Sequence, residues 1–498
     1  MPLRAVVRRS YYRDSMVLMR VAETLRALPD VSEAAALMGT PANHELLASA
    51  GLATDETKDA GVGDLVLAVR AETESAAEAG LAEAERVLSE SRSSTATTAG
   101  RALPRTLDAA LRQMPEANLA AISVPGEYAA FEAQRALRRG LHVFLFSDNV
   151  SLDDEIALKR LAADRGLFCM GPDCGTAYVN GVGLGFANVV PRGRVGCVAA
   201  SGTGLQAVVS RLAALGEGVS HGIGVGGRDL SAEVGGLMTL RALDALAADT
   251  TTEAIVVISK PPAPEVVPQL AAAIDRIAKP VVVCCLGATP AGSAAGRWVS
   301  TLEDAAELAL ATLRGQTWSP RVFTDPADVR ARLARARGTI LGLYTGGTLA
   351  HEAGLVLEPL VGANAYRLVD LGGDEFTRGR PHPMIDPSAR AAHVRQAGES
   401  DAVGVLLVDL VLGRAVHSDP AAPLAEAIYD ARRAAAARGR ALGVVASVVG
   451  TDGDPQDLRR QSATLQAAGV EVLPSNAQAA RFAALLIRPD LARSLLGS

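Results

Sequence analysis

The sequence predicts an α/β protein built from several doubly wound parallel sheets of the Rossmann or flavodoxin-like kind, preceded by a small N-terminal α+β domain. Three observations lead to this prediction. Short apolar runs of strand length alternate with amphipathic segments at helical spacing from about residue 104 onward. Glycine- and proline-rich stretches follow many of these runs, where strand-to-helix turns are expected. The chain after residue 330 loosely repeats the order of motifs before it, which indicates two similar domains.

Length and composition bound the number of domains. The chain has 498 residues, of which 49% are apolar and 21% charged, and this length exceeds what one core holds. We therefore predict four domains, which span residues 1–90, 101–190, 191–320 and 330–498.

Charge and hydropathy argue against nucleic-acid and membrane functions. The net charge is -6 and the sequence has no basic stripe, so no nucleic-acid partner is expected. No uncharged apolar run approaches the roughly 18–20 residues of a membrane span, so no membrane contact is expected. The N-terminus lacks a signal-peptide pattern, and the cysteines lie mostly in apolar runs, as reduced, buried thiols do. We predict a cytoplasmic protein without a metal site.

Residues 1–90 predict a small α+β domain used for docking or oligomerisation. A polar, low-complexity stretch from Ser89 to Gly100 follows and indicates a linker. The predicted strands are 5–8 and 64–70, and the predicted helices are 16–28 and 75–88.

The domain of residues 101–190 predicts a CoA-binding-like Rossmann sheet, because strands and helices alternate along it. Ligands of such sheets bind at the carboxyl ends of the strands, where this chain is rich in glycine and proline. The predicted strands are 119–124, 142–146 and 167–170, and the predicted helices are 128–138 and 153–165.

The third domain contains the stretch around which the chain is organised. Val195–Ala200 is an apolar run of strand length, Ser201-Gly202-Thr203-Gly204 interrupts it, and apolar residues then recur at helical spacing up to Leu212. A strand, a glycine turn and a helix in this order place backbone N–H groups at the positive end of a helix dipole, where phosphate binds. A tight turn without a ligand gives the same pattern, and both interpretations stay open.

The fourth domain repeats this organisation. A predicted strand at 339–344 leads into Thr345-Gly-Gly-Thr348, as the strand before Ser201 leads into its own glycine turn. Two similar doubly wound domains explain the repeat. The later predicted strands are 403–407, 442–449 and 470–473.

Several motifs resemble known families. Gly171-Pro-Asp-Cys-Gly175, Val198-Ala-Ala-Ser-Gly-Thr-Gly204 and Lys279-Pro-Val-Val-Val-Cys-Cys-Leu-Gly-Ala288 look like the α subunit of succinyl-CoA synthetase. The second repeat is similar to the carboxyl-terminal domain of the β subunit of that enzyme. The fused order and the strings 370–387 and 445–456 resemble the FdrA family.

The resemblance implies where an anion binds. In the synthetase family two helix amino termini, one from each half, face a phosphorylated histidine, and opposed dipoles of this kind stabilise an oxyanion. The first terminus maps onto Ser201–Gly204 and the second onto the loop Gly413–Asp419. The phosphate-binding residues implied are Ser201, Gly202, Thr203, Gly204, Gly413 and Arg414.

Three departures from the synthetase pattern bear on the reaction. The stretch 291–298, near which the family carries its phosphorylated histidine, contains no histidine. The polar linker stands where the family has the glycine-rich loop that opens its CoA-binding domain. The sequence contains neither an ATP-grasp domain nor a P-loop pattern. The chain alone therefore does not predict an ATP-driven ligase that works through a phosphohistidine.

We expect phosphate-dependent acyl or carbamoyl transfer, with phosphate as a substrate and CoA as the one other ligand considered. Some FdrA-family proteins resemble a component of oxamate carbamoyltransferase, which converts oxalurate and phosphate into oxamate and carbamoyl phosphate during allantoin breakdown. This resemblance implies partner subunits, and a homo-oligomer is expected. The alternatives are an acyl-CoA ligase, with CoA held near residues 123–148 and ATP handled by another chain, and a non-catalytic scaffold.

Candidate site residues come from loops at predicted strand ends. Arg228 and His417 are the candidate catalytic residues, the first as a bidentate ligand of phosphate or carboxylate and the second as an acid–base group. A surface Arg–Asp pair and a capping histidine are the competing interpretations. Lys260 is a further candidate anion contact, and Asp454 is more typical of an Asx turn than of a metal ligand. The candidate substrate-binding residues are Gly226, Gly227, Asp229, Arg378, Arg380 and Asn476.

Overall fold

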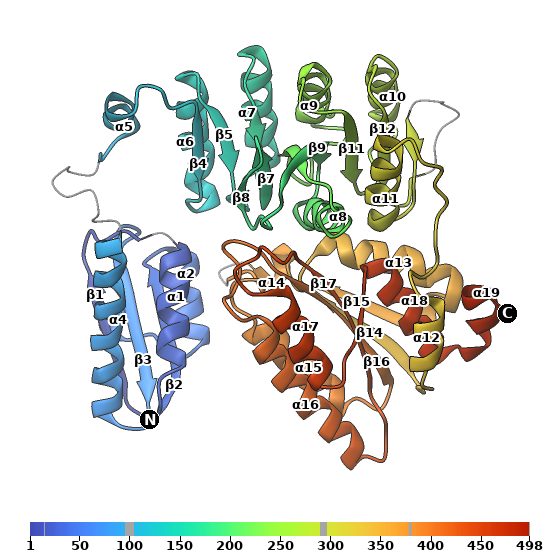
Figure 1. Ribbon diagram of the computed structural model, residues 1–498. Coiled ribbons are helices and arrows are strands. Elements are labelled where there is room, and N and C mark those ends of the chain that lie inside the picture. The colour runs from blue at the N-terminus through green and yellow to red at the C-terminus, as the bar shows by residue number, and fades with distance from the viewer. Residues whose placement is uncertain (14, 95–103, 289–295, 378–380, 498) are drawn as a thin grey trace. The chain divides into compact units, whose positions relative to one another are not determined.

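The computed structural model of the chain describes residues 1–13, 15–94, 104–288, 296–377 and 381–497 (Figure 1). The chain divides into two compact units, one formed by residues 1–117 with 377–381 and the other by residues 118–376 with 382–498.

The N-terminal unit is a three-stranded antiparallel sheet in the order β1-β3-β2, covered by helices. Helices α1 and α4 pack on one face of the sheet, and α2 packs on the other. The strands are β1 (Leu3–Arg8), β2 (Val31–Met38) and β3 (Leu65–Ala71), and the helices are α1 (Ser15–Arg26), α2 (Pro41–Ser49), α3 (Asp55–Lys58), α4 (Glu74–Ser94) and α5 (Leu107–Gln113).

Two details of this unit differ from the sequence predictions. Strand β2 was not predicted, because its stretch Val-Ser-Glu-Ala-Ala-Ala-Leu-Met lacks the β-branched and aromatic residues typical of strands. Helix α4 continues through the first part of the predicted linker to Ser94. The rest of that linker, residues 95–100, lies outside the described residues.

The larger unit begins with a three-stranded parallel sheet in the order β4-β5-β6. Helices α6 and α7 follow the first two strands, as the alternating pattern predicts. The elements are β4 (Leu119–Ile122), α6 (Gly126–Arg138), β5 (His142–Leu145), α7 (Leu152–Asp164) and β6 (Cys169–Met170).

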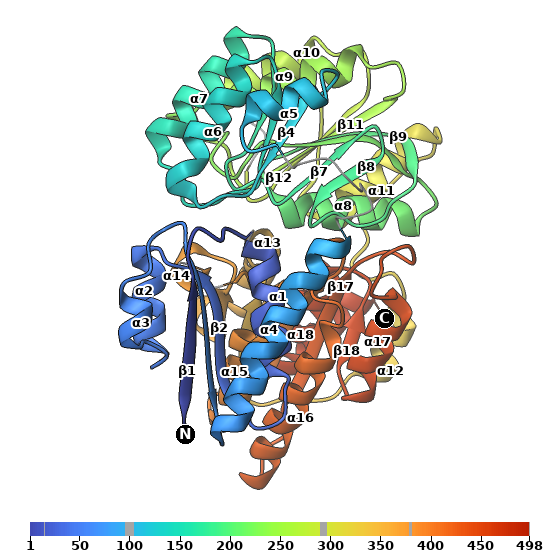
Figure 2. The same ribbon diagram turned by 90° about the vertical axis from the view of Figure 1, so that its left-hand side faces the viewer.

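A seven-stranded sheet follows, in the order β13-β12-β11-β9-β10-β7-β8. The strands are parallel except for the edge hairpin of β7 and β8, which pairs antiparallel with β10. Helices α8 and α11 lie on one face and α9 and α10 on the other (Figure 2). The strands are β7 (Thr176–Val179), β8 (Val182–Gly185), β9 (Arg192–Ala199), β10 (Val219–Gly224), β11 (Ala254–Ser259), β12 (Val281–Cys285) and β13 (Arg297–Trp298), and the helices are α8 (Gly202–Ala214), α9 (Leu237–Ala248), α10 (Val267–Asp275) and α11 (Leu302–Leu313).

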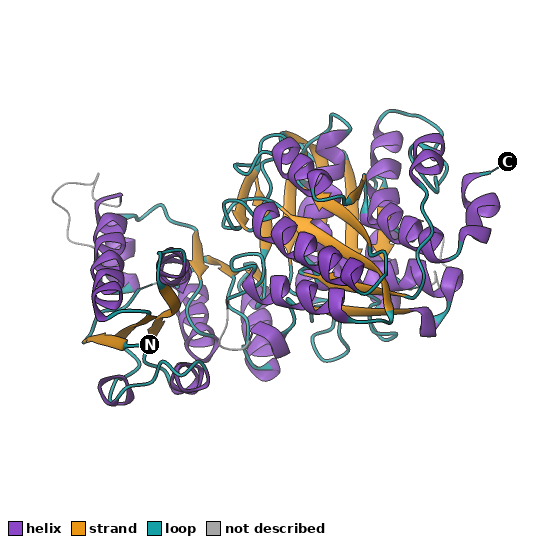
Figure 3. Ribbon diagram, turned by 90° about the horizontal axis from the view of Figure 1, so that it is seen from below, coloured by secondary structure: helices purple, strands orange, loops and turns teal. Residues whose placement is uncertain are grey.

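A five-stranded parallel sheet completes the unit, in the order β15-β14-β16-β17-β18. Helices α13 and α18 pack with one face and α15 and α16 with the other, so that helices lie on both sides of the strands (Figure 3). The strands are β14 (Thr339–Tyr344), β15 (Tyr366–Asp370), β16 (Val403–Val411), β17 (Gly443–Val449) and β18 (Glu471–Leu473), and the helices are α12 (Pro326–Arg332), α13 (Gly347–Val361), α14 (Asp374–Thr377), α15 (Ser388–Glu399), α16 (Ala421–Ala437), α17 (Leu458–Ala467), α18 (Asn476–Ile487) and α19 (Ala492–Leu496), with short 3-10 turns η1 (Ala363–Ala365) and η2 (Pro489–Leu491).

The two larger sheets share one topology. Numbered from β9, the first sheet has the strand order 2-1-3-4-5 (β10, β9, β11, β12, β13), and numbered from β14 the second sheet has the same order. Helix α8 therefore corresponds to α13, because each follows the first strand of its repeat. Ligands of this fold bind at the carboxyl ends of the strands, where the strand order reverses, and these two helices begin there.

One hydrophobic core joins the two repeats and holds their strand ends together. It contains β9 and α8 residues from the first repeat and β14 and α13 residues from the second, among them Val195, Leu205, Ile340 and Leu349. Helix α8 contacts α13 directly. The fold therefore sets the amino termini of these two helices side by side.

Candidate anion-binding site

Helix α8 begins in the geometry that the Ser-Gly-Thr-Gly turn predicts. Ser201 is the N-cap in extended backbone, and its Oγ accepts a hydrogen bond from the N–H of Gly204 at 2.8 Å. The same hydroxyl donates to Oγ1 of Thr348, at 2.6 Å, in the first turn of α13. One serine therefore caps one helix and ties it to the start of the other.

The amino terminus of α8 is an open donor site. Within the described residues, neither the N–H of Gly202 nor that of Thr203 has a hydrogen-bond acceptor. Oγ1 of Thr176 lies beside them, since a Cβ added to Gly202 would be 3.5 Å from it. Thr176 is 1% exposed, and its hydroxyl likewise makes no hydrogen bond to any described residue. Two backbone donors and a buried hydroxyl at the positive end of a helix suit an oxyanion.

The corresponding terminus of α13 is already occupied by a carboxylate. Asp409, at the end of β16, accepts hydrogen bonds from the N–H groups of Thr345 and Gly346, each at 2.9 Å. It also pairs with the buried guanidinium of Arg390 at 2.9 Å. Burial raises the pKa of Asp409, and Arg390 and the Thr345 and Gly346 donors act in the opposite direction. Asp409 therefore satisfies the turn that leads into α13, while the N–H groups of Gly347 and Thr348 in the first turn of the helix have no acceptor among the described residues.

A second carboxylate borders the start of α13. Oδ2 of Asp370 lies where a side chain at Gly347 would project, 2.2 Å from the Cβ position. Burial raises the pKa of Asp370, while the N–H of Gly372 and the charge of Lys260 lower it. Lys260 is thus close enough to act on the Asp370 carboxylate. It follows the carboxyl end of β11, and β11 pairs with β9, the strand that leads into α8. The charge of Lys260 supports the predicted role of an anion contact.

His351 is a partly buried polar residue near the start of α13 that the sequence analysis did not consider. It lies three residues after Thr348 on α13, so both project from neighbouring positions on the helix surface. Its Nε2 is buried and has no hydrogen-bond partner among the described residues. Burial lowers the pKa of the imidazole, and the backbone of Leu286 raises it. The imidazole is therefore mainly neutral at pH 7, and the spacing from the Thr345–Thr348 turn could have revealed it.

The predicted pair Arg228 and Asp229 has a structural role. Asp229 is 0% exposed and bonds the ammonium of Lys159 at 2.8 Å and the hydroxyl of Thr239 at 2.7 Å. Arg228 donates to the carboxylate of Glu155 at 2.7 Å. The carboxylate of Asp229 is fully buried in this network, so it is not open to a substrate. Arg228 ties α7 to the loop after β10 while its side chain stays 46% exposed, so its predicted role as an anion ligand stays a prediction.

The two glycines before this pair differ from each other. Gly226 has a φ of 85°, and a Cβ there would lie 2.5 Å from the carbonyl oxygen of Pro172, so glycine is required for the close approach of the two loops. Gly227 is exposed and has no atom within 4 Å of its Cβ position.

The predicted second helix terminus lies elsewhere than expected. Helix α16 begins at Ala421, beyond the loop Gly413–Asp419, and has no side-chain cap. The N–H of Gly413 is taken by Oε1 of Gln456 at 3.2 Å, and that of Arg414 by the carbonyl of Ala187 at 2.8 Å. These groups therefore offer no open donors, although the Arg414 side chain is exposed.

His417 caps its own turn, which agrees with the interpretation of a capping histidine rather than an acid–base group. Its Nδ1 accepts the N–H of Asp419 at 3.0 Å, and its backbone N–H donates to Met384. Asp454 is likewise a turn residue, since its carboxylate accepts the N–H of Thr451 at 2.8 Å and the side-chain amide of Asn188 at 2.8 Å.

Asn476 is also satisfied internally. Its amide donates to Glu352 and to the carbonyl of Leu349, each at 2.8 Å, and its oxygen accepts from Tyr344. It joins α18 to α13 and is buried. Arg378 and Arg380 lie outside the described residues.

The five cysteines are buried and unpaired, as the apolar runs predict. Burial raises the pKa of the Cys174 thiol to about 12, so it is not a thiolate at neutral pH. Among the described residues, no group of three or more His, Cys, Asp or Glu side chains is placed to hold a metal ion.

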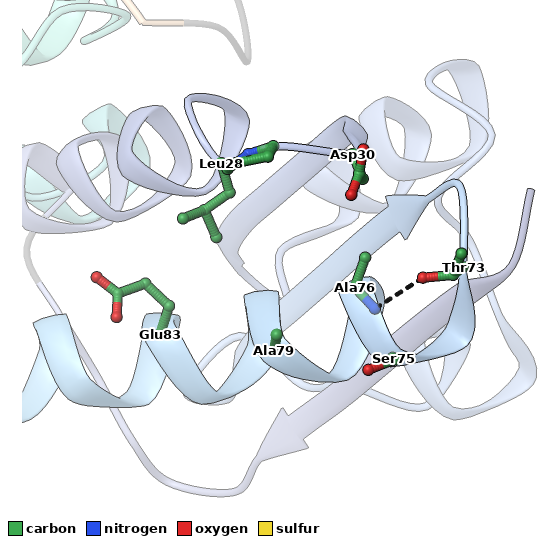
Figure 4. Close-up of a pocket in the computed structure, with 8 residues that line it drawn as sticks. Leu28, Asp30, Thr73, Ser75, Ala76, Ala79 and Glu83 are labelled. Carbon is green, nitrogen blue, oxygen red and sulfur yellow. Dashed lines mark hydrogen bonds between the residues drawn. The ribbon is translucent and has the colours of Figure 1, made fainter.

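An open hollow in the N-terminal unit, of about 480 Å³, lies between α4 and the turn after α1 (Figure 4). Small side chains such as Ala76 and Ala79 line much of it. The hydroxyl of Thr73 accepts the N–H of Ala76 at 3.1 Å and so caps α4. Asp30, Ser75 and Glu83 also line this hollow, and no hydrogen bond joins them to one another among the described residues.

Comparison with known proteins places this architecture in a class. Residues 343–486 match the family model described as CoA-ligase, and residues 1–104 match the model described as AllF, heavy metal-associated domain. The chain thus contains a CoA-ligase-like domain near its carboxyl end and an AllF-like domain at its amino end. No helix in the described ranges is long and apolar enough to span a membrane.

The chain belongs to the family of the uncharacterized protein YahF of Escherichia coli strain K12. The two are 40% identical over 501 residues, which cover 96% of this chain and 97% of YahF.

Solved structures show more distant similarity. The acetyl-coenzyme A synthetase 1 of Ca. Korarchaeum cryptofilum, in complex with phosphate and ADP, is 17% identical, covers 76% of this chain and 84% of its own, and has a TM-score of 0.33. ATP citrate lyase from Methanothrix soehngenii, in complex with citrate and coenzyme A, is 17% identical over 46% of this chain and 45% of its own, with a TM-score of 0.34.

The N-terminal domain does not fit the metal that its family description implies. Heavy-metal sites use cysteine thiolates and histidine imidazoles, and residues 1–104 contain no cysteine and one histidine. That histidine, His44, has its Nε2 2.9 Å from the carbonyl oxygen of Ala60. The domain therefore matches the heavy metal-associated family but lacks the cysteine and histidine ligands that such a metal site uses.

Proposed function

We propose that this protein binds inorganic phosphate at the amino terminus of α8 and uses it as a substrate in acyl or carbamoyl transfer. The observation that carries the proposal is the open donor set of Gly202, Thr203 and Thr176. Phosphate is a weak nucleophile, and fixed donors beside a carbonyl carbon supply the orientation and charge stabilisation that its attack requires.

The reaction we favour is that of an oxamate carbamoyltransferase component in allantoin breakdown, as FdrA-type proteins suggest. A phosphate oxygen attacks the ureide carbonyl of oxalurate, the C–N bond to the oxamate nitrogen breaks, and carbamoyl phosphate and oxamate leave. The leaving nitrogen takes up one proton. Nε2 of His351, unbonded in the described structure, is the acid–base group that we assign to this transfer.

The charges around the site support a carboxylate-bearing substrate. Lys260 carries a positive charge at the carboxyl edge of the first large sheet. Its charge lowers the pKa of both Asp370 and His351. A substrate carboxylate near Lys260 would displace Asp370 as its partner. We further propose that partner subunits complete the site and that the chain forms a homo-oligomer.

An acyl-CoA ligase is the second candidate, favoured by the CoA-ligase match over residues 343–486. CoA would then bind at the loops of residues 123–148. The turn there is closely packed, since a Cβ at Gly126 would lie 2.3 Å from the carbonyl oxygen of Asp148. A non-catalytic scaffold is the third candidate.

Two assays separate these candidates. The purified chain, alone and with the products of neighbouring genes, is incubated with oxalurate and phosphate, and carbamoyl phosphate is measured. Carbamoyl phosphate whose formation at limiting phosphate falls about tenfold in Thr176→Val supports the transferase. Thioester formed only with ATP and CoA supports the ligase and contradicts the transferase, and no product in either assay, without phosphate binding, supports the scaffold.

A further inference from the structure

A second cavity lies at the opposite edge of the sheets from α8, where no function is assigned. It has a volume of about 380 Å³, within the range of small-molecule sites. It lies between the amino ends of β4, β5 and β6 on one side and β7, β10 and the end of α9 on the other. It is therefore formed where two sheets meet, a common place for ligand sites.

The first polar group of this cavity is the imidazole of His142. Its Nδ1 accepts the backbone N–H of Phe168 at 3.0 Å, which requires the neutral ring to carry its proton on Nε2. Burial lowers the pKa of His142, and the charge of Arg241 lowers it further. The ring is therefore neutral at pH 7 and presents one fixed N–H donor.

His221 repeats this arrangement from the other wall. Its Nδ1 accepts the backbone N–H of Asn180 at 3.1 Å, so its proton also resides on Nε2. Burial lowers its pKa, against the charge of Asp249. Nε2 lies 3.9 Å from Oδ2 of Asp249, too far for a direct hydrogen bond.

Asp249 supplies an acceptor next to this donor. Its pKa is held at about 2 despite burial, because Thr252 and Thr251 donate hydrogen bonds to it. These donors take three of the roughly four acceptor positions of a carboxylate. Two of these donors bond Oδ2, so the free acceptor position is on Oδ1 of the same carboxylate that faces Nε2 of His221.

Apart from Asn118, the remaining wall is apolar. Leu119, Met170, Val179, Ile223 and Leu246 line it, and the Phe168 ring lies 5.7 Å from the His142 ring, centroid to centroid. Such a wall favours a flat ring, which loses little conformational freedom on binding. An anion is disfavoured by the ionised Asp249, and a cation by the two N–H donors.

We propose that this cavity binds an uncharged, flat heterocycle with a lactam edge, its carbonyl accepting from Nε2 of His221 and its N–H donating to Asp249. The donor of His142 serves a second acceptor on the same ring system. The site is separate from the phosphate site and does not depend on the proposed reaction.

The test uses the full-length chain and quinolin-2-one, a two-ring lactam, as the probe in isothermal titration calorimetry. We expect saturable binding at about one site per chain. Quinolin-2-one should bind at least tenfold more tightly than its N-methyl derivative or naphthalene, because these lack the donor or both polar groups.

Three variants locate the binding. His221→Phe keeps ring volume and removes the donor, and we expect about tenfold weaker binding. Val179→Trp fills the mouth of the cavity from a side chain that is 40% exposed, so it tests the site even if His221→Phe fails to fold. His393→Phe, on α15, is the matched control and should leave binding unchanged. Absence of saturable binding, or binding that Val179→Trp leaves unchanged, overturns the proposal.

Discussion

Helices α8 and α13 occupy equivalent places in two repeats of one topology, and their amino termini nevertheless differ in chemistry. The α8 terminus leaves two backbone N–H groups and the Thr176 hydroxyl without partners in the described structure. The turn before α13 gives the N–H groups of Thr345 and Gly346 to Asp409, and the carboxylate of Asp370 lies against Gly347.

The difference teaches which half of a duplicated fold can bind an external anion. A helix terminus attracts one negative charge, and a carboxylate from the same chain competes with any ligand for it. In the second repeat, Asp409 on the third strand, β16, binds the turn before α13 and competes there with an external anion. In the first repeat Lys260 follows the third strand, β11, and no carboxylate of the described residues bonds the N–H groups that begin α8.

The largest expected effect comes from removing the internal anion. Asp409→Ala leaves the buried guanidinium of Arg390 and the two α13 N–H groups without their acceptor, and we expect a loss of about 3–5 kcal/mol of unfolding free energy. Denaturant unfolding measures it. Asp430→Ala, which breaks the partly exposed pair with Arg395, is the control and should cost no more than about 1 kcal/mol. Equal losses in the two variants would contradict the role given to Asp409.

A buried acid on α13 should make stability depend on pH. Burial raises the pKa of Glu352 to about 7, above its unfolded value of 4.5. The protonated form therefore stabilises the fold below pH 4.5, and this contribution, up to about 3 kcal/mol, is lost as pH rises to 7.

Glu352→Gln removes this titration. The melting temperature of the variant, relative to that of the parent protein, should rise between pH 5 and pH 8. Glu358→Gln changes an exposed acid on the same helix and should show no such trend. A parallel pH dependence in parent and Glu352→Gln would show that Glu352 does not titrate in this range.

A methyl group at the open terminus should abolish phosphate binding. In Gly202→Ala the new Cβ lies 3.5 Å from Oγ1 of Thr176, an ordinary contact that the fold accepts, but it fills the space between the donors. We expect about 100-fold weaker phosphate binding with an unchanged melting temperature. Gly63→Ala, which meets no atom within 4 Å, is the control. Titration calorimetry with phosphate measures the affinity. An unaltered phosphate affinity in Gly202→Ala would mean that phosphate binds elsewhere.

A smaller effect is expected from the hydroxyl alone. Thr176→Val preserves shape and removes one donor, so phosphate affinity should fall about tenfold. Stability should hold or increase, because the hydroxyl has no partner in the described structure. A stability loss of more than about 1 kcal/mol would instead mean that Thr176 serves the fold.

Local patterns predicted the α8 site better than they predicted its surroundings. The apolar run before Ser201 and the glycine turn after it are local signals, and strand β9, the turn and helix α8 all formed as expected. The partner of Asp229 could not be predicted, because Lys159 is 70 residues away and the two meet only through packing. The same holds for Asp409, whose contacts to Thr345 lie 64 residues apart.

One missed element had a readable signal. Asn180-Gly181 joins β7 to β8 with φ values of 53° and 78°, and Asn-Gly between apolar strands is typical of a two-residue hairpin. Recognising it would have moved 176–185 from the predicted 101–190 domain into the next sheet. It would also have placed Thr176 at the carboxyl edge beside Gly202.

The most direct test is an anomalous-diffraction measurement on crystals of the full chain soaked in selenate, a phosphate-like oxyanion. We predict an anomalous peak at the amino terminus of α8, within hydrogen-bond distance of the Gly202 and Thr203 N–H groups and the Thr176 hydroxyl. The α13 terminus should show none. A peak at α13, or none at α8 at a selenate concentration that occupies other sites, would contradict the account.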